Sequence, residues 1–233
     1  MMRLFTHLIL APFLMVSTAF AGEGQRQVVV ELFTSQGCSS CPPADALLHE
    51  LAAREDVIAL ALHVDYWDYI GWKDVFANNA YTRRQHAYAK AGKRRMVYTP
   101  QMIVNGQQDV VGNRPKDVNA LINRHMGQPK TVDLSVTRQG GQITVSAQSL
   151  SGAEPLIVQM VRFVPQSDVK ITRGENAGNT FSYANVVTDL VELGRWDRRA
   201  ALSMKARVDQ EANIAVILQR PGFGAIEAAA LVR

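Results

Sequence analysis

The chain has 233 residues, of which 47% are hydrophobic and 20% charged. This composition is typical of a soluble globular protein of one or two domains and argues against disorder, collagen-like repeats and a multi-span membrane protein. Residues 22–129 hold 12 basic and 11 acidic side chains, and residues 130–233 hold 12 and 10. A nucleic-acid-binding domain usually has a concentrated basic surface, so the sequence argues against nucleic acid as a partner.

Residues 1–21 have the pattern of a cleaved secretory signal peptide. Arg3 is their only Lys or Arg, an apolar stretch follows over residues 8–16, and an Ala-Phe-Ala tripeptide at residues 19–21 places small residues where a signal peptidase cleaves. An uncleaved anchor is the weaker interpretation, because Pro12 interrupts an apolar run that is already short for a membrane span. We therefore expect a mature protein that works in the periplasm or outside the cell, without a membrane attachment.

The first half of the mature chain alternates strand and helix patterns. Strands are predicted over residues 26–34, 57–64, 101–105 and 108–111, and helices from residue 42, over residues 74–91 and over residues 115–126. The nearly continuous apolar run in the first strand is typical of a strand buried on both faces. Pro42 and Pro43 fall in the first turn of the first helix, where a missing N–H group has no consequence. The pattern predicts an α/β domain over residues 22–128, with an aromatic and helical insertion after the second strand.

From Thr131 the pattern changes to the short-period alternation of β-hairpins. Strands are predicted over residues 132–136, 143–147, 156–164, 186–193, 200–208 and 214–219. We therefore expect an all-β, sandwich-like domain over residues 129–233.

The two cysteines, Cys38 and Cys41, are separated by two serines. A disulfide used as scaffolding normally joins distant segments, and closing so short a loop contributes only about 2 kcal/mol, against about 3 kcal/mol for fifteen residues. Cys38 stands where a helix follows a strand, so unpaired backbone N–H groups and the helix dipole stabilise its thiolate. Cys41, one turn later and less exposed, is placed to attack a mixed disulfide on Cys38. The spacing predicts a redox pair in which reduced Cys38 reacts faster with iodoacetamide, while metal binding and an inert bridge are the alternatives.

Thr99-Pro100 directly precedes the strand predicted from Gln101. With this dipeptide, the chain resembles the thioredoxin-like superfamily over about residues 26–127. The resemblance implies a cis bond before Pro100, close to both cysteines, and a Thr99 backbone free to pair with a substrate chain. The alternative is a trans proline that only marks the start of a strand.

Three motifs give a closer resemblance to a family of bacterial secreted proteins of uncharacterised function. They are ELFTSQGCSSCPPAD at residues 31–45, HVDYWD at residues 63–68 with Gly-Trp at residues 71–72, and Arg-Gly-Glu-Asn at residues 173–176. The chain departs from thioredoxin itself in having Ser39-Ser40 between the cysteines and no Trp before Cys38. The dipeptide influences the redox potential, so the sequence does not indicate whether the protein oxidises, reduces or isomerises disulfides.

Other side chains are candidates for the same site. Asp65 follows the second strand at the sheet edge where the helix N-terminus also emerges, and a carboxylate there could move protons for Cys41. The neighbouring aromatics either form an apolar wall around a peptide or small thiol or belong to the core: Tyr66, Trp67, Tyr69 and Trp72. His49 and His63 are expected to be packed or surface residues, and the loop at residues 173–180 is expected to be a structural turn.

The sequence thus predicts an extracytoplasmic thiol–disulfide oxidoreductase, with Cys38 as nucleophile and Cys41 as resolving residue. Its partners would be protein or small-molecule thiols and disulfides, and it would need no cofactor. In the main alternative, the two thiolates hold a soft metal such as Cu(I), with His63 or a methionine completing the site. In a third hypothesis, the first domain is an idle scaffold and the second domain binds a partner.

Overall fold

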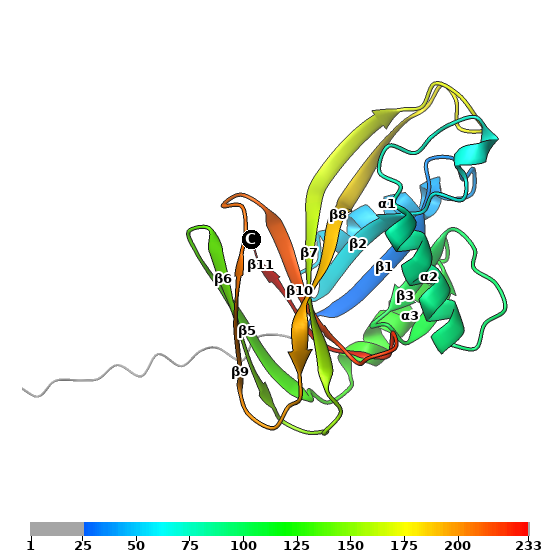
Figure 1. Cartoon of the computed structure of the whole chain (residues 1–233). Coiled ribbons are helices and arrows are strands. Elements are labelled where there is room, and N and C mark those ends of the chain that lie inside the picture. Colours follow the sequence, from blue (N-terminus) through cyan, green and yellow to red (C-terminus); the bar gives the residue numbers. More distant parts are fainter. Residues whose placement is uncertain (1–25, 233) are drawn as a thin grey trace, which may run out of the picture.

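The computed structural model describes residues 26–232, so the signal peptide predicted over residues 1–21 lies outside the described part of the chain. The helices are α1 (Pro42–Ala52), α2 (Asn79–Ala91) and α3 (Pro115–Met126), with a short 3-10 helix, η1, at Asp68–Ile70. The strands are β1 (Val28–Thr34), β2 (Val57–His63), β3 (Gln101–Val104), β4 (Gln108–Val111), β5 (Val132–Gln139), β6 (Gln142–Ser149), β7 (Leu156–Lys170), β8 (Thr180–Trp196), β9 (Leu202–Arg207), β10 (Asn213–Gln219) and β11 (Ile226–Val232) (Figure 1). None of the described helices is long and apolar enough to cross a membrane.

The protein is a mixed α/β structure with one large mixed sheet and a second, antiparallel sheet. The large sheet has the strand order β11-β10-β7-β8-β2-β1-β3-β4, and the small one has the order β5-β6-β9. β1 runs parallel to β2 and antiparallel to β3, which places Phe33 beside Gln101. A parallel contact between Ala61 and Val186 joins β2 to β8. The large sheet therefore contains strands from both halves of the chain.

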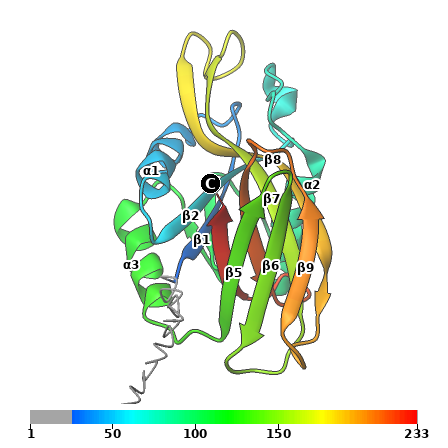
Figure 2. The same ribbon diagram turned by 90° about the vertical axis from the view of Figure 1, so that its left-hand side faces the viewer.

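Helices cover both faces of the part of this sheet that the first half of the chain forms. α1 and α3 pack on one face, and α2 lies on the other (Figure 2). On the α2 side, the core also includes side chains of β7, β8 and β10. Because both faces are covered, all seven residues of β1 are buried, as the continuous apolar run predicts.

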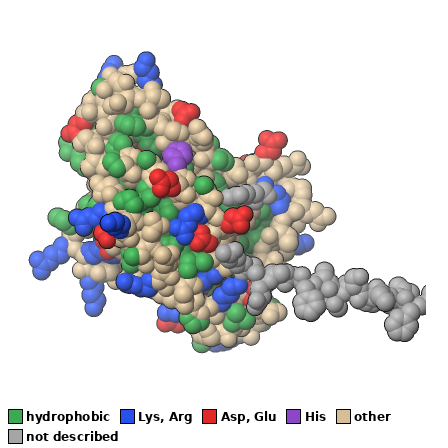
Figure 3. Space-filling model, turned by 180° about the vertical axis from the view of Figure 1, so that it is seen from behind, with side chains coloured by type: hydrophobic (Ala, Val, Ile, Leu, Met, Phe, Trp, Pro, Cys, Tyr) green, Lys and Arg blue, Asp and Glu red, His purple; other side chains and the backbone are tan. Residues whose placement is uncertain are grey.

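The second half of the chain forms two packed layers. The small sheet lies against β7, β10 and β11 (Figure 2). Apolar side chains of both sheets pack between the two layers. This is the sandwich-like packing expected for residues 129–233, but one of its two layers continues into the sheet of the first half. On the face seen in Figure 3, basic, acidic and hydrophobic side chains are interspersed, in keeping with the even charge distribution of the sequence.

Four elements differ most from the sequence-based expectation. α2 begins at Asn79 and not at residue 74, because the Asn78 side chain accepts the N–H of Ala80 and caps the helix there. β7 and β8 form a long hairpin that extends well beyond the predicted ranges. β11 was not predicted, because its alanine-rich centre has weak strand propensity and is held by pairing with β10.

Candidate functional site

The two cysteines form a disulfide in the short connection between β1 and α1. Their Cα atoms are 5.4 Å apart, and the N–H of Cys41 donates to the backbone oxygen of Cys38. Cys41 is the N-cap of α1, with prolines in the first turn as the sequence predicts. Cys38 is 1% exposed and Cys41 0%. Cys41 is expected to be the less exposed of the two, but in the disulfide form their exposures hardly differ. The two serines between them are exposed.

Pro100 lies near the first turn of α1. The Thr99–Pro100 peptide bond is cis, as the superfamily resemblance implies. A side-chain carbon at Gly112 would come within 3.1 Å of Ala44 Cβ and 3.3 Å of Pro100 Cβ, so helix and proline flank the same glycine. Pro100 also accepts the N–H of Gly112 on its backbone oxygen. Strand β3, which follows this proline, is the neighbour of β1.

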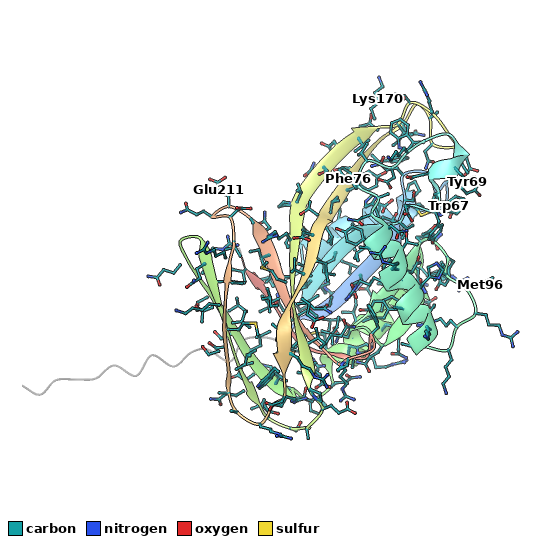
Figure 4. All side chains as sticks on the ribbon, viewed as in Figure 1. Trp67, Tyr69, Phe76, Met96, Lys170 and Glu211 are labelled. Atoms are coloured by element: carbon teal, nitrogen blue, oxygen red, sulfur yellow. A yellow bond between two sulfur atoms is a disulfide. The ribbon has the colours of Figure 1, made fainter. Side chains whose placement is uncertain are left out.

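The aromatic segment after β2 divides into residues that hold the disulfide loop and one that faces solvent. Trp67 lies against Gly37, where an added side-chain carbon would be 3.2 Å from Trp67 Cβ, and its Nε1 donates to Thr99 Oγ1 at 2.8 Å. Trp72 donates from Nε1 to Gln36 Oε1 at 2.8 Å. Tyr69 is 81% exposed, and Figure 4 shows it close to Trp67 at one end of the molecule. Trp67 and Trp72 thus pack on the disulfide loop, and the apolar wall around a peptide or small thiol stays a prediction.

A buried polar cluster connects this segment with the disulfide loop. Asp74 Oδ2 accepts the N–H of Gln36 at 2.8 Å and lies 2.7 Å from His63 Nδ1. The His63 ring is fully buried and packs edge-on against Phe76 and Tyr183. Within residues 26–232, His63 Nε2 has no hydrogen-bond partner. His63 is therefore a packed residue, as expected, and its partner Asp74 also fixes the loop that leads to Cys38.

Asp45 is a buried carboxyl one turn into α1. It is 6% exposed, accepts a hydrogen bond from Thr34 Oγ1 at 2.8 Å, and its N–H donates to the backbone oxygen of Cys41. Burial raises the pKa of Asp45 to about 7, opposed by the nearby His63 and by the Thr34 hydrogen bond. Asp45 is not among the site residues that the sequence predicts. The available signal was an acidic side chain on an otherwise apolar helix face.

Asp65, the carboxylate expected to move protons, is held at the start of α2. Its two oxygens accept hydrogen bonds from Thr82 Oγ1 at 2.6 Å and from Asn79 Nδ2 at 2.9 Å. Burial alone would raise its pKa, but these hydrogen bonds outweigh burial and hold the pKa of Asp65 below its usual value. The observed role of Asp65 is therefore to fix the first turn of α2.

The tip of the β7–β8 hairpin supplies a residue to the site from the second half of the chain. Asn176 is 7% exposed, and its Nδ2 donates to the backbone oxygens of Gln36 at 2.9 Å and Cys38 at 3.2 Å. The loop is a turn, as expected, and it also contacts the disulfide loop. Its only sequence signal was membership of the Arg-Gly-Glu-Asn motif. His49 of α1 contacts the same hairpin, with Nε2 lying 2.9 Å from the backbone oxygen of Ser182.

Within the described range 26–232, no group of three or more His, Cys, Asp or Glu side chains is arranged to hold a metal ion. The metal-binding alternative assigned Cys38, Cys41 and His63 to one site. The structure joins the two sulfurs in a disulfide and places His63 Nδ1 beside Asp74.

The site is thus a buried disulfide at the N-terminus of a helix in a mixed α/β protein, completed by a hairpin from the second half of the chain. Residues 29–219 match the family described as "Protein of unknown function (DUF1223)", and the chain belongs to this family. The crystal structure of protein AGR_C_4864 from Agrobacterium tumefaciens is similar, with 32% identity, a TM-score of 0.76, and coverage of 88% of this chain and 93% of that one.

HBP35 of Porphyromonas gingivalis has a related fold, with a TM-score of 0.64, 15% identity, and coverage of 89% of this chain and 75% of that one. No curated protein matches the chain. The comparisons therefore identify a family and a fold, and they leave the chemistry of the site to be argued from its residues.

Proposed function

We propose that the first half of the chain is thioredoxin-like and that the protein is a thiol–disulfide oxidoreductase working outside the cytoplasm. The observation that carries this proposal is the Cys38–Cys41 disulfide at the N-terminus of α1, in the short connection that follows β1. At this position the positive end of the helix dipole favours a thiolate on Cys38 once the disulfide is reduced. Protein or small-molecule thiols and disulfides are the proposed partners.

The exchange is balanced without a cofactor. A client thiolate attacks Cys38 Sγ, the bond to Cys41 Sγ breaks, and Cys41 leaves as a thiolate that takes up a proton. A second client thiolate then attacks the client sulfur of the mixed disulfide, which releases Cys38 as a thiolate. Two electrons pass from the client to the cysteine pair. In the reverse direction, Cys38 attacks a client disulfide and Cys41 resolves the mixed disulfide.

Asp45 is the carboxyl whose position supports a proton role in this exchange. It follows Cys41 by four residues in α1, a spacing that places two side chains on the same face of a helix. Its pKa of about 7 allows it to accept or release a proton near neutral pH, whereas Asp65 is held ionised by its hydrogen bonds. We therefore assign to Asp45 the role that the sequence suggested for Asp65.

The proposed function is tested by trapping clients on the mature protein with Cys41→Ser. Removing the resolving thiol should leave Cys38 in mixed disulfides, seen as high-mass species on non-reducing gels that disappear with dithiothreitol. Cys38→Ser is the matched control and should give none.

If folded Cys41→Ser protein forms no adducts in its native compartment, the proposed oxidoreductase function is overturned. The metal-binding alternative would instead be supported by stoichiometric copper in the purified mature protein that is lost in both cysteine variants.

A further inference from the structure

The disulfide is covered, although its loop reaches the surface. Cys38 is 1% exposed and Cys41 0%, whereas Ser39 and Ser40 between them are exposed. The rate of thiol–disulfide exchange depends on access of the attacking thiolate to one of the two sulfurs. A client thiol can therefore react with this disulfide only after part of the cover has moved.

Two segments, one from each half of the chain, lie against the disulfide loop. The first is the aromatic segment, in which Trp67 lies against Gly37 next to Cys38. The second is the loop between β7 and β8, residues 171–179, which we call the hairpin tip. The two segments touch, because a side-chain carbon at Gly174 would lie 3.2 Å from Trp72 Cβ. Figure 1 shows the hairpin tip and the segment with η1 at the same end of the molecule.

Asn176 is the polar link between the hairpin tip and the disulfide loop. Its Nδ2 donates to the backbone oxygens of Gln36 at 2.9 Å and Cys38 at 3.2 Å. The Cys38 oxygen also accepts the N–H of Cys41 at 3.2 Å. The amide of Asn176 thus binds the same carbonyl that closes the turn between the two sulfurs.

The hairpin tip has its own internal hydrogen bonds. Ile171 is fully buried, its N–H donates to the oxygen of Asn179 at 2.8 Å, and its oxygen accepts the N–H of Gly178 at 2.9 Å. These bonds do not involve the disulfide loop. The tip can therefore separate from that loop as a unit, with loss of the two Asn176 bonds and of its packing on Trp72.

We propose that Asn176 is a positioning residue that holds the hairpin tip closed over the disulfide, and that a thiol reaches Cys38 when this contact opens. The identity of the physiological thiol rests on the proposed function, whereas the closed cover affects any thiol. The role of the second half of the chain is then to control access to the cysteine pair.

The test measures how fast dithiothreitol reduces the disulfide of the mature protein. Asn176→Ala should be reduced about tenfold faster than the wild type, because two hydrogen bonds of the closed state are lost. Asn176→Asp should be at least as fast, since its carboxylate oxygens would face two carbonyl oxygens. Asn119→Ala is the control, because its amide donates to the backbone oxygen of Pro115 on α3, and its reduction rate should not change. Urea midpoints measured in parallel separate local opening from loss of global stability.

An unchanged reduction rate in an Asn176 variant that keeps the wild-type urea midpoint would overturn the proposal. The wild type provides a second measurement that needs no variant. Its reduction rate should rise less steeply with urea below the unfolding transition than global unfolding does, because lifting the tip exposes much less surface than unfolding the whole chain. A dependence as steep as that of global unfolding, or a rate equal to that of an unfolded chain, would overturn the proposal as well.

The two proposals fail separately. If the Asn176 variants are reduced faster but Cys41→Ser traps no client, the cover stands and the oxidoreductase is overturned. If clients are trapped and the reduction rates of the variants are unchanged, only the role of Asn176 is overturned.

Discussion

The surroundings of Asp45 and Asp65 shift the pKa values of these two carboxyl groups in opposite directions. Asp45 is 6% exposed and accepts one side-chain hydrogen bond, from Thr34, while Asp65 accepts two, from Thr82 and Asn79. Burial raises the pKa of Asp45 to about 7, whereas hydrogen bonds outweigh burial and lower the pKa of Asp65. Near neutral pH, the first group exchanges a proton and the second stays ionised.

Replacing Asp45 with Asn should change how stability depends on pH. The folded-state pKa of about 7 lies above the usual value of 3.8, so between these values the folded protein keeps a proton that the unfolded chain releases. By linkage, the stabilising contribution of Asp45 is fully present below about pH 4 and declines by up to about 1.4 kcal/mol per pH unit as pH rises toward 7.

Urea unfolding from pH 4 to pH 8 checks this. As the pH rises, the free energy of unfolding of the wild type should fall relative to that of Asp45→Asn. Asp65→Asn is the control. The lowered pKa of Asp65 stabilises the folded state above the unfolded pKa of 3.8, and this contribution is lost as pH falls below about 5 and through the folded value, so its difference from the wild type should be nearly flat above about pH 5. A constant difference between wild type and Asp45→Asn would contradict the raised pKa.

At the scale of elements, the sequence predicts those that are determined by local signals. β1 follows from its apolar run, and α1 from its two prolines after the cysteine pair. The start of α2 was wrong because Asp74 uses its side chain to bind Gln36 N–H and Phe76 N–H, which ties residues 74–78 to the disulfide loop instead of a helix.

In the candidate site, too, only the features determined by local signals could be predicted from the sequence. The position of the cysteine pair before a helix could be predicted from spacing alone. The contact of Asn176 with Cys38 could not, because it joins residues 138 positions apart and depends on the length of the β7–β8 hairpin. The burial of Asp45 likewise depends on packing around α1, which periodicity does not reveal.

α2 is attached to the sheet by a buried ion pair. Arg84 Nε donates to Glu31 Oε1 of β1 at 2.6 Å, and the exposed fractions of the two side chains are 6% and 0%. Tyr88 donates its hydroxyl to the other oxygen of Glu31 at 2.5 Å. Burial tends to lower the pKa of Arg84, but the attraction of Glu31 outweighs this and raises it, so Arg84 stays charged.

Arg84→Met should destabilise the protein by about 3–5 kcal/mol, because it leaves the Glu31 carboxylate buried with no cation. The double variant Glu31→Met, Arg84→Met should recover much of this loss, since neither charge then remains. Arg114→Met is the control, because Arg114 pairs with Asp117 at 4.0 Å on the surface, and its effect should be below about 1 kcal/mol. Urea unfolding measures all three. A double variant less stable than Arg84→Met would show that the pair stabilises the fold by itself.

At the scale of the whole molecule, the β7–β8 hairpin joins the two halves of the chain. β8 pairs with β2 through Val186, Tyr183 packs 4.9 Å from the His63 ring, and Asn176 binds the disulfide loop. The buried cluster on the α2 side includes side chains from β7, β8, β10 and β11: Val161, Phe163, Val187, Ala215, Ile217 and Ile226. The first half therefore shares both its sheet and part of its core with the second.

The two-domain expectation can be tested by expressing residues 22–128 alone. This fragment retains the disulfide and three helices, but it lacks β8, the neighbour of β2, and every side chain that the second half contributes to the shared core. Each large apolar side chain left exposed loses about 1.5–3 kcal/mol of burial, so several such losses exceed the stability of a typical domain. We expect the fragment to show no cooperative urea transition and no near-ultraviolet circular dichroism of packed aromatics, whereas residues 22–233 show both. A fragment that unfolds cooperatively and keeps the dithiothreitol reduction rate of the full chain would mean that residues 22–128 form an independent domain. The hairpin tip would then not be needed to cover the disulfide.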